Sequence, residues 1–318
     1  MTLKALHQGL PKFARDVLLL GKASFYEALA QELSLKIRFE DIRRPEDWKA
    51  GAEFIPCYFP GDFPTRIVRG RSDTRLTALA VRSIESAVAL AMKKKVDAIV
   101  TPPINKSGLK KAGFNIPGHT EFLAKLSKTR RFEMMLVGGP LRVVLVTRHL
   151  ALKEVPAALS KRRVEETILL ADFELRRSFG IRRPRLVVCG LNPHAGEEGN
   201  LGKEEMRIIE PAVRKARAKT NAEITGPLSP DALFHEAYRG KYDAEICMYH
   251  DQGLIPLKMI SRGSGVNVTL GLPFVRTSPD HGTAYDIAEQ GSADPGSMAE
   301  ALRLARLLSC NRKNACPA

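Results

Sequence analysis

Short apolar runs alternate with amphipathic stretches along most of the chain. Six of the runs have the length and composition of buried strands: 16–21, 98–100, 141–146, 186–189, 245–248 and 266–270. Between them, apolar residues recur at the spacing of a helix face in three stretches: 74–95, 164–180 and 295–308. Strands that alternate with helices are typical of α/β proteins. The pattern therefore predicts an α/β fold with a largely parallel sheet.

The order of these segments does not separate the chain into consecutive domains. The 318 residues are enough for two ordinary domains. The sequence contains no internal repeat and no low-complexity linker. We therefore expect two domains that are interwoven along the sequence.

The charge balance is basic, with 50 Lys and Arg residues against 35 Asp and Glu residues. These cations are scattered over the predicted helix faces, and aromatic residues make up only 6% of the chain. A nucleic-acid interface of clustered basic and aromatic side chains is therefore not indicated, and we expect no nucleic-acid partner. A positive field around a site for an anionic substrate is compatible with the same charge.

The expected location is the cytoplasm. No apolar run approaches the roughly 20 residues that a membrane span needs, and the first residues lack the apolar core of a signal peptide. The cysteines are far apart and odd in number: Cys57, Cys189, Cys247, Cys310 and Cys316. This arrangement predicts neither a disulfide framework nor a structural zinc site, and Cys189 and Cys247 are expected in the core.

Polar clusters follow several of the predicted strands. In parallel sheets, ligands bind outside the carboxyl ends of the strands, so these clusters are the expected place for chemistry. The clusters are 101–106 with 117–122, 147–150, 190–196, 249–253 and 271–286. They hold five of the 7 histidines.

His149, His194 and His250 each follow a different predicted strand. A single histidine in such a place is more often a packing or capping residue than a ligand. Three of them favour a shared metal, and imidazole ligands suit zinc, iron, cobalt or nickel. On the residues alone, the packing and metal interpretations are equally good.

Taken in order, the clusters from about Val96 to Met298 resemble the signature of the 4-hydroxythreonine-4-phosphate dehydrogenases of pyridoxal phosphate biosynthesis. The segment 281–288 also resembles the cofactor loop of isopropylmalate and isocitrate dehydrogenases, whose fold this family shares. The resemblance implies two interwoven α/β domains with the active site in the cleft between them. Residues 1–118 and 268–318 would form the cofactor-binding domain, and residues 119–267 the metal-binding and dimerisation domain.

The resemblance also implies a role for each matching residue. The metal ligands are His149, His194 and His250, the last of which comes from the neighbouring subunit of a homodimer. The substrate-binding residues are His119, Thr120, Lys258, Asn267 and Arg276. The cofactor-binding residues are Gly271, His281, Gly282 and Asp286. For proton transfer the candidates His119, Asp251 and Lys258 stay open, and Asp251 has the alternative role of orienting His250.

The implied reaction needs NAD or NADP and a divalent metal such as zinc, magnesium or cobalt. Oxidation of 4-phosphohydroxy-L-threonine at C3 gives a β-keto acid, and loss of carbon dioxide from it gives 3-amino-2-oxopropyl phosphate. The metal would lower the pKa of the substrate hydroxyl. Lys258 and Arg276 offer cationic donors to a phosphate or carboxylate.

Three other functions compete with this one. A paralogue that oxidises D-threonate or D-erythronate 4-phosphate would use the same metal and cofactor. A phosphate acyltransferase has a related fold but would not need three metal-binding histidines. A basic RNA-binding protein would bind with a steep dependence on salt.

The start of the chain departs from the family pattern. Family members begin with a strand and a Gly-Asp-Pro-x-Gly-Ile-Gly-Pro-Glu loop, whereas residues 2–6 here resemble the helix that follows that loop. We expect a native chain with this strand and loop upstream. The longer chain should melt at a higher temperature and bind NAD more tightly.

Overall fold

The computed structural model describes residues 1–8, 16–48, 53–61, 63 and 70–315. The chain divides into two units, one of residues 1–130 and 272–306 and the other of residues 131–271 and 307–318. Both units are discontinuous in sequence. The sequence prediction placed the boundaries at 118/119 and 267/268. The structure keeps residues 119–130 in the first unit, because helix α6 (His119–Leu126) packs against helix α4 (Thr74–Met92).

The first unit contains a small sheet and a separate pair of strands. The small sheet has the parallel order β1 (Leu19–Leu20), β3 (Ile55–Tyr58), β2 (Phe39–Asp41). Strand β4 (Ala98–Val100) pairs in parallel with β11 (Val275–Pro279). Besides α4 and α6, the helices are α1 (Thr2–Gln8), α3 (Ala23–Glu32), α5 (Lys106–Lys111) and the first part of α12 (Gly296–Ala315), with short turns η1 (Pro45–Asp47) and η5 (Tyr285–Ile287).

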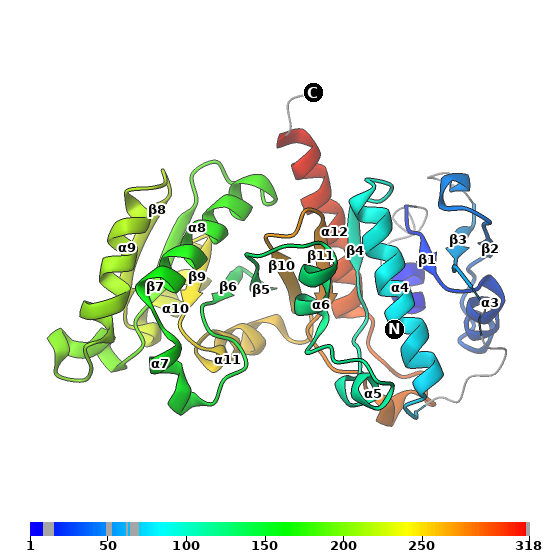
Figure 1. Cartoon of the computed structure of the whole chain (residues 1–318), viewed down its shortest axis with the longest axis horizontal. Helices are drawn as coiled ribbons and strands as arrows, with labels where there is room; N and C mark the ends of the chain where they lie inside the picture. The colour runs from blue at the N-terminus through cyan, green and yellow to red at the C-terminus, as the bar shows by residue number, and fades with distance from the viewer. Residues whose placement is uncertain (9–15, 49–52, 62, 64–69, 316–318) are drawn as a thin grey trace. The chain divides into compact units, whose positions relative to one another are not determined.

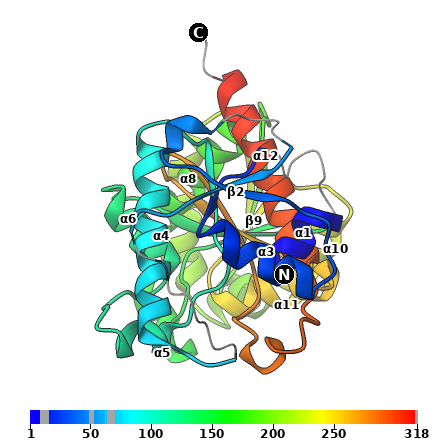
Figure 2. The same ribbon diagram turned by 90° about the vertical axis from the view of Figure 1, so that its right-hand side faces the viewer.

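An apolar core joins the small sheet to the helices around it. Leu3 and Leu6 of α1 are buried in one cluster with Phe39, Ile55 and Met298. Figure 2 shows α1 and α3 beside α12, from which Met298 reaches this core. The residues at the start of the chain thus form a helix that buries one face.

The long helix α4 begins where a side chain satisfies its first backbone N–H groups. The Asp73 carboxylate accepts hydrogen bonds from the backbone N–H groups of Arg75 (2.7 Å) and Leu76 (3.3 Å). These bonds pair donors that the first turn leaves without partners inside the helix. Val81, Ile84 and Val88 are buried along one face, as their spacing predicts.

The second unit is built on strands in the order β10, β5, β6, β9, β7, β8. Their bounds are β5 (Glu133–Gly138), β6 (Leu141–Leu145), β7 (Arg185–Cys189), β8 (Glu223–Leu228), β9 (Ala244–Cys247) and β10 (Val266–Leu270). The pairs β6–β9, β9–β7 and β7–β8 are parallel, whereas β5 is antiparallel to both of its neighbours. The largely parallel sheet is confirmed. The antiparallel hairpin of β5 and β6 was not predicted.

Helices cover both faces of these strands. The helices of this unit are α7 (Val155–Ala158), α8 (Lys161–Arg177), α9 (Glu210–Arg217), α10 (Pro230–Tyr238) and α11 (His250–Ser261), with the short turns η2 (Leu152–Glu154) and η3 (Pro193–Gly199) and the π-helical segment η4 (Glu205–Ile209). Leu233 of α10 and Leu257 of α11 pack on Val143 and Val187. Val144, which follows Val143 in β6 and therefore points to the opposite face of the sheet, is fully buried too. Strands β6 and β9 contact α8, and α8 packs beside α9 (Figure 1).

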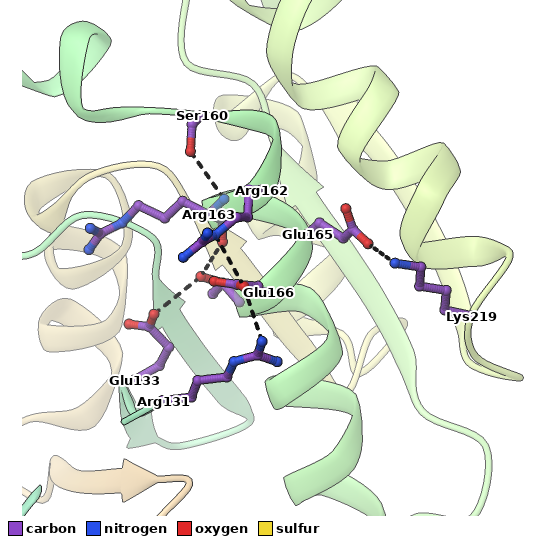
Figure 3. A network of polar contacts seen from close by, with 9 residues as sticks. Arg131, Glu133, Ser160, Arg162, Arg163, Glu165, Glu166 and Lys219 are labelled. Carbon is purple, nitrogen blue, oxygen red and sulfur yellow. Dashed lines mark hydrogen bonds and ion pairs between the residues drawn. The ribbon is translucent and has the colours of Figure 1, made fainter. Parts of the chain in front are cut away.

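The start of α8 shows how polar contacts fix a helix in this unit. Ser160 Oγ accepts a hydrogen bond of 3.2 Å from Arg163 N and begins the helix (Figure 3). One turn further on, Glu165 forms an ion pair of 2.5 Å with Lys219, which follows α9 (Figure 3). The ion pair between Glu165 and Lys219 joins α8 to the end of α9.

Cys189 and Cys247 are fully buried, as predicted for core residues. They stand on neighbouring strands with their Sγ atoms 3.7 Å apart. The last helix runs to Ala315 and is longer than the predicted span of 295–308. Within the part of the chain that the structure describes, no helix has both the length and the apolar character to cross a membrane.

Candidate active site

The three strands that precede His149, His250 and His194 are neighbours in the sheet. Strand β9 lies between β6 and β7, and all three run in the same direction. Leu145 is the register partner of Cys247, and Val188 is the partner of Ile246. The three histidine-bearing segments therefore leave the sheet at the same edge, where ligands bind in parallel sheets.

His149 and His250 lie side by side. The pairing of β6 with β9 continues past the strand ends, because Val146 N donates to Cys247 O (2.8 Å) and Thr147 Oγ1 donates to Met248 O (2.6 Å). This pairing brings the two imidazoles to a centroid separation of 5.6 Å. Two rings that contact one ion through nitrogens at about 2.0–2.1 Å have a similar spacing, so the pair fits a shared metal.

His250 is held by its neighbour in sequence. The Nδ1 atom of His250 lies 2.6 Å from Oδ1 of Asp251. This contact leaves Nε2 as the nitrogen that is available to a ligand, which is the arrangement common among metal-binding histidines. The geometry therefore favours the orienting role of Asp251 over a role in proton transfer.

The helix that begins at His250 is seated unusually close to the sheet. A Cβ atom on Gly253 would lie 2.3 Å from Cγ1 of Val143 and 2.8 Å from Sγ of Cys247. No side chain fits in that space, so only glycine lets α11 approach the strands at this point. The position of His250 thus depends on a glycine one turn along the helix.

His194 lies in a turn of rare conformation. Every residue from His194 to Glu198 has a positive φ, between 44° and 84°. Left-handed backbone costs roughly 1–2 kcal/mol for each residue other than glycine, and only Gly196 in this turn is glycine. Strain of this kind persists only where the surroundings stabilise it, and it is frequent at functional sites.

Within one chain, His194 is not part of the pair that His149 and His250 form. The His194 side chain is exposed and lies near Asp231, whose pKa is lowered mainly by a hydrogen bond from Ser229 and least by the charge of His194. Among the described residues, no three or more His, Cys, Asp and Glu side chains gather in a form that could hold a metal ion.

Arg276 is the most deeply buried cation of the predicted substrate site. Its residue is only 2% exposed, and its Nη2 donates a hydrogen bond of 2.8 Å to Thr101 Oγ1. Burial lowers the pKa of Arg276 to about 10, and the negative charge of Glu121 opposes that shift. The guanidinium is therefore still positively charged at neutral pH, in surroundings where an anion is strongly attracted.

His119 and Thr120 begin helix α6 in the same unit as Arg276. Burial, and to a smaller extent the charge of Arg276, lowers the pKa of His119 to about 3. The imidazole is therefore neutral at physiological pH and has one nitrogen that donates and one that accepts hydrogen bonds. Thr120 is buried beside it.

The remaining predicted residues lie on separate elements. In the second unit, Lys258 is exposed on α11, and Asn267 stands on β10 opposite Leu136 of β5. In the first unit, His281, Gly282 and Asp286 are exposed in the segment that follows β11.

Gly271 makes a tight turn, which is the structural alternative to a part in cofactor binding. Its φ is 87°, and a Cβ atom there would lie 2.4 Å from the carbonyl oxygen of Arg131. Its N–H donates to the buried carboxylate of Glu174 at 3.2 Å. The residue is therefore a glycine because of the turn that it makes. A part in cofactor binding stays a prediction.

Comparison with known proteins agrees with these motifs. Residues 12–305 match the model of the family described as pyridoxal phosphate biosynthetic protein PdxA. The chain belongs to this family. It is 54% identical over 222 residues to the 4-hydroxythreonine-4-phosphate dehydrogenase of Desulfosudis oleivorans, an alignment that covers 70% of this chain and 66% of that protein. The enzyme of the same name from a Sulfurihydrogenibium species is 41% identical, with 98% of this chain and 94% of the relative covered.

Solved structures of PdxA-family proteins share the fold. The crystal structure of the 4-hydroxythreonine-4-phosphate dehydrogenase of Klebsiella pneumoniae superimposes with a TM-score of 0.88 at 41% identity, over 96% of this chain and 92% of that one. The predictions of a PdxA-type α/β fold and of a dehydrogenase of pyridoxal phosphate biosynthesis are confirmed. None of these comparisons favours the sugar-acid phosphate or acyltransferase alternatives.

Three residues that contact the predicted site were not singled out from the sequence. Thr101 accepts the hydrogen bond of Arg276, Gln252 links the segments of His194 and His250, and Glu205 binds the base of the His194 loop. The position of Thr101 directly after β4 was a usable signal. Gln252 lies in the predicted polar cluster 249–253, so its position was a usable signal too. Glu205 carried no local signal, because it lies outside the predicted clusters and binds backbone groups 13 and 14 residues away.

Proposed function

We propose that this chain catalyses the NAD-dependent oxidation and decarboxylation of 4-phosphohydroxy-L-threonine, with a divalent metal held by His149, His194 and His250. The observation that carries the proposal is the pair of imidazoles 5.6 Å apart at the ends of adjacent parallel strands. The loop of His194 leaves the same edge of the sheet from the next strand. Family membership adds the reaction to this geometry, and we place the enzyme in the cytoplasm.

The donor set suits a catalytic metal. Neutral imidazoles bind zinc and cobalt well, and a site with three protein ligands keeps a position open for substrate. When bound, such a metal would lower the pKa of the substrate hydroxyl and polarise the carbonyl formed from it. Asp251 is proposed to fix the ring of His250 through Nδ1, which leaves Nε2 for the metal.

Arg276 is the proposed anchor for a negatively charged group of the substrate. Thr101 holds one guanidinium nitrogen in place, and a buried cation binds phosphate or carboxylate through charge-assisted hydrogen bonds. Thr120 and the neutral His119, which belong to the same unit as Arg276, are proposed to supply further hydrogen bonds. Lys258 and Asn267 are the remaining proposed substrate-binding residues. The neutral imidazole of His119 is proposed to accept a hydrogen bond from the substrate, because a pKa of about 3 makes it a weak base for proton transfer.

The cofactor is proposed to bind at His281, Gly282 and Asp286. These residues are exposed and follow strand β11, so they lie at the carboxyl end of a parallel strand. A bound nicotinamide would take the hydride from C3 of the substrate.

The first test is the reaction itself. We expect the purified protein to reduce NAD when 4-phosphohydroxy-L-threonine is added, to lose this activity after treatment with a chelator, and to regain it with zinc, magnesium or cobalt. The measurement is absorbance of the reduced cofactor. D-threonate 4-phosphate and D-erythronate 4-phosphate are the control substrates, because they carry a hydroxyl group in place of the amine. Faster turnover of either control would overturn the proposed substrate.

We also propose that the enzyme works as a homodimer in which two copies share each metal site. Helix α11, which His250 begins, exposes Ile255 (59%) and Met259 (75%) one turn apart on the same face. Exposed large apolar residues on one helix face are typical of a surface that a partner covers. A second copy of this chain is the proposed partner, which would place the contact on the helix that carries a proposed ligand.

Mixing inactive variants in pairs tests which chain supplies which ligand. His149→Ala, His194→Ala and His250→Ala proteins are unfolded and refolded together, two at a time. If His250 comes from the partner, His250→Ala mixed with either other variant should recover about a quarter of the wild-type activity, because half of the dimers are mixed and each has one intact site. The pair of His149→Ala and His194→Ala should stay inactive.

A different pattern of recovery would identify a different arrangement. Recovery only in mixtures that contain His194→Ala would mean that His194 is the ligand that crosses, with His149 and His250 supplied by one chain. No recovery in any mixture, with mixed dimers detected by mass, would contradict a shared site. Each variant refolded alone is the control for residual activity.

A further inference from the structure

The left-handed turn of His194 is folded around one buried carboxylate. Glu205 is only 1% exposed and opens a short π-helical segment, η4. Its Oε1 accepts hydrogen bonds from the backbone N–H groups of Leu191 (2.7 Å) and Asn192 (2.8 Å). Its Oε2 accepts one from the side-chain amide of Asn192 (2.9 Å). Both oxygens of Glu205 thus bind the segment that leads directly into His194.

Glycines around this carboxylate leave no room for other side chains. A Cβ atom on Gly196 would lie 2.7 Å from Oε2 of Glu205, and one on Gly202 would lie 2.2 Å from Nδ2 of Asn192. The loop is therefore wrapped closely around the Glu205–Asn192 pair. A carboxylate with three donors also explains how the strained backbone from His194 to Glu198 persists, since charged acceptors form the stronger hydrogen bonds.

The same loop is tied to the segment that carries His250. The buried Gln252 side chain donates from Nε2 to Gly190 O (2.7 Å) and accepts at Oε1 from Met248 N (2.7 Å). Gly190 begins the loop that Glu205 holds, and Met248 lies two residues before His250. The Gln252 amide thus fixes the position of the His194 loop relative to His250. The Glu205 carboxylate fixes it relative to η4.

We propose that Glu205 is a positioning residue for the metal site. Its carboxylate fixes the left-handed turn and thereby places the imidazole of His194 where it binds the metal. This inference rests on the proposed function, which makes His194 a metal ligand. It goes beyond that function because it assigns a role to a residue that touches neither metal nor substrate.

The test is the affinity of the metal-free protein for Zn²⁺, measured by competition with a chromophoric chelator. In Glu205→Gln, an NH₂ group replaces one carboxylate oxygen. This group cannot accept a hydrogen bond from the N–H donors that the oxygen accepted from. We expect the dissociation constant for Zn²⁺ to rise by roughly 10–100-fold, as it does when outer-shell partners of metal ligands are lost. Glu165→Gln is the matched control, because Glu165 is also a buried carboxylate of this unit but pairs with Lys219 (Figure 3). Its affinity should equal that of the wild type.

A role in stability alone would give a different result. Thermal unfolding of the metal-free proteins measures their stability separately. If Glu205 had only a structural role, Glu205→Gln would melt at a lower temperature than the wild type but, while folded, would bind Zn²⁺ with the same affinity. That outcome would overturn the proposal. Asn192→Ala provides a second variant if Glu205→Gln does not fold, because it removes one contact of Glu205 and leaves the carboxylate in place. It should weaken Zn²⁺ binding in the same direction, and unchanged affinity in it would also overturn the proposal.

His194→Ala separates failure of this inference from failure of the proposed function. If His194→Ala binds Zn²⁺ as tightly as the wild type, His194 is no ligand and the proposed metal site is wrong. If His194→Ala loses Zn²⁺ while Glu205→Gln keeps it, the metal site stands and the positioning role of Glu205 is wrong. Loss of affinity in both variants, with Glu165→Gln unaffected, is the expected result.

Discussion

The His194→Ala enzyme is expected to lose most of its bound metal and nearly all of its turnover. A site with three imidazole ligands has no spare donor, so the loss should exceed the roughly 10–100-fold weakening expected for an outer-shell change. Elemental analysis of the purified protein measures the metal, and NAD reduction measures the turnover. Melting temperatures should change little, because the His194 side chain is exposed.

A histidine outside the polar clusters provides the control for this experiment. His7 is exposed at the end of α1, and His7→Ala should keep the metal content and activity of the wild type. Full metal occupancy and normal turnover in His194→Ala would contradict the proposed metal site. Full occupancy with lost turnover would mean that His194 serves the reaction in some way other than holding the metal.

The sequence predicted which loops carry the site because that signal is local. Each of His149, His194 and His250 follows an apolar run of strand length, and the runs are strands in the structure. Which strands are neighbours depends on pairing between distant segments, which no local pattern encodes. The pairing of β6 with β9, for example, joins Thr147 to Met248. The closeness of His149 and His250 could therefore not be predicted from the residues alone.

The turn at His194 shows a second limit. Gly196 in this turn and Gly199 directly after it signal a turn, but not a left-handed run that includes several other residues. That conformation depends on Glu205, which folds back from η4 to the base of the loop. The sequence contains the acidic pair Glu204–Glu205, yet nothing in it distinguishes a buried acceptor from a solvated surface charge. The contacts had to be seen before a role could be assigned.

The hairpin of β5 and β6 was missed for a different reason. The run Glu133–Gly138 has the composition of a strand, and the turn that follows contains Gly139 with a φ of 56°. Two apolar runs separated by a glycine turn are a usual signal for a hairpin. The alternation of helices and parallel strands predicts no hairpin at this point. The fold class was still predicted correctly, because the strand pairs β6–β9, β9–β7 and β7–β8 are all parallel.

Replacing Arg276 with glutamine is expected to raise the Michaelis constant for 4-phosphohydroxy-L-threonine by roughly 10–100-fold. A hydrogen bond between a charged donor and an anion contributes about 1.5–3 kcal/mol, and each 1.4 kcal/mol corresponds to about tenfold in affinity. The effect should fall on the Michaelis constant more than on kcat, because Arg276 holds the substrate and does not take part in hydride transfer. Steady-state NAD reduction over a range of substrate concentrations measures both parameters.

Two further variants make this result specific to the buried guanidinium. Arg276→Lys keeps the charge but loses the planar arrangement of donors, so its Michaelis constant should lie between those of the wild type and Arg276→Gln. Arg303→Gln removes a cation of the same unit that forms a surface ion pair with Glu300, and it should leave the Michaelis constant unchanged. An unchanged constant in Arg276→Gln would show that the substrate's anionic groups bind elsewhere. The buried charge of Arg276 would then serve contacts within the protein, among them its hydrogen bond to Thr101 and its attraction to Glu121, a costly use of a guanidinium that is 2% exposed.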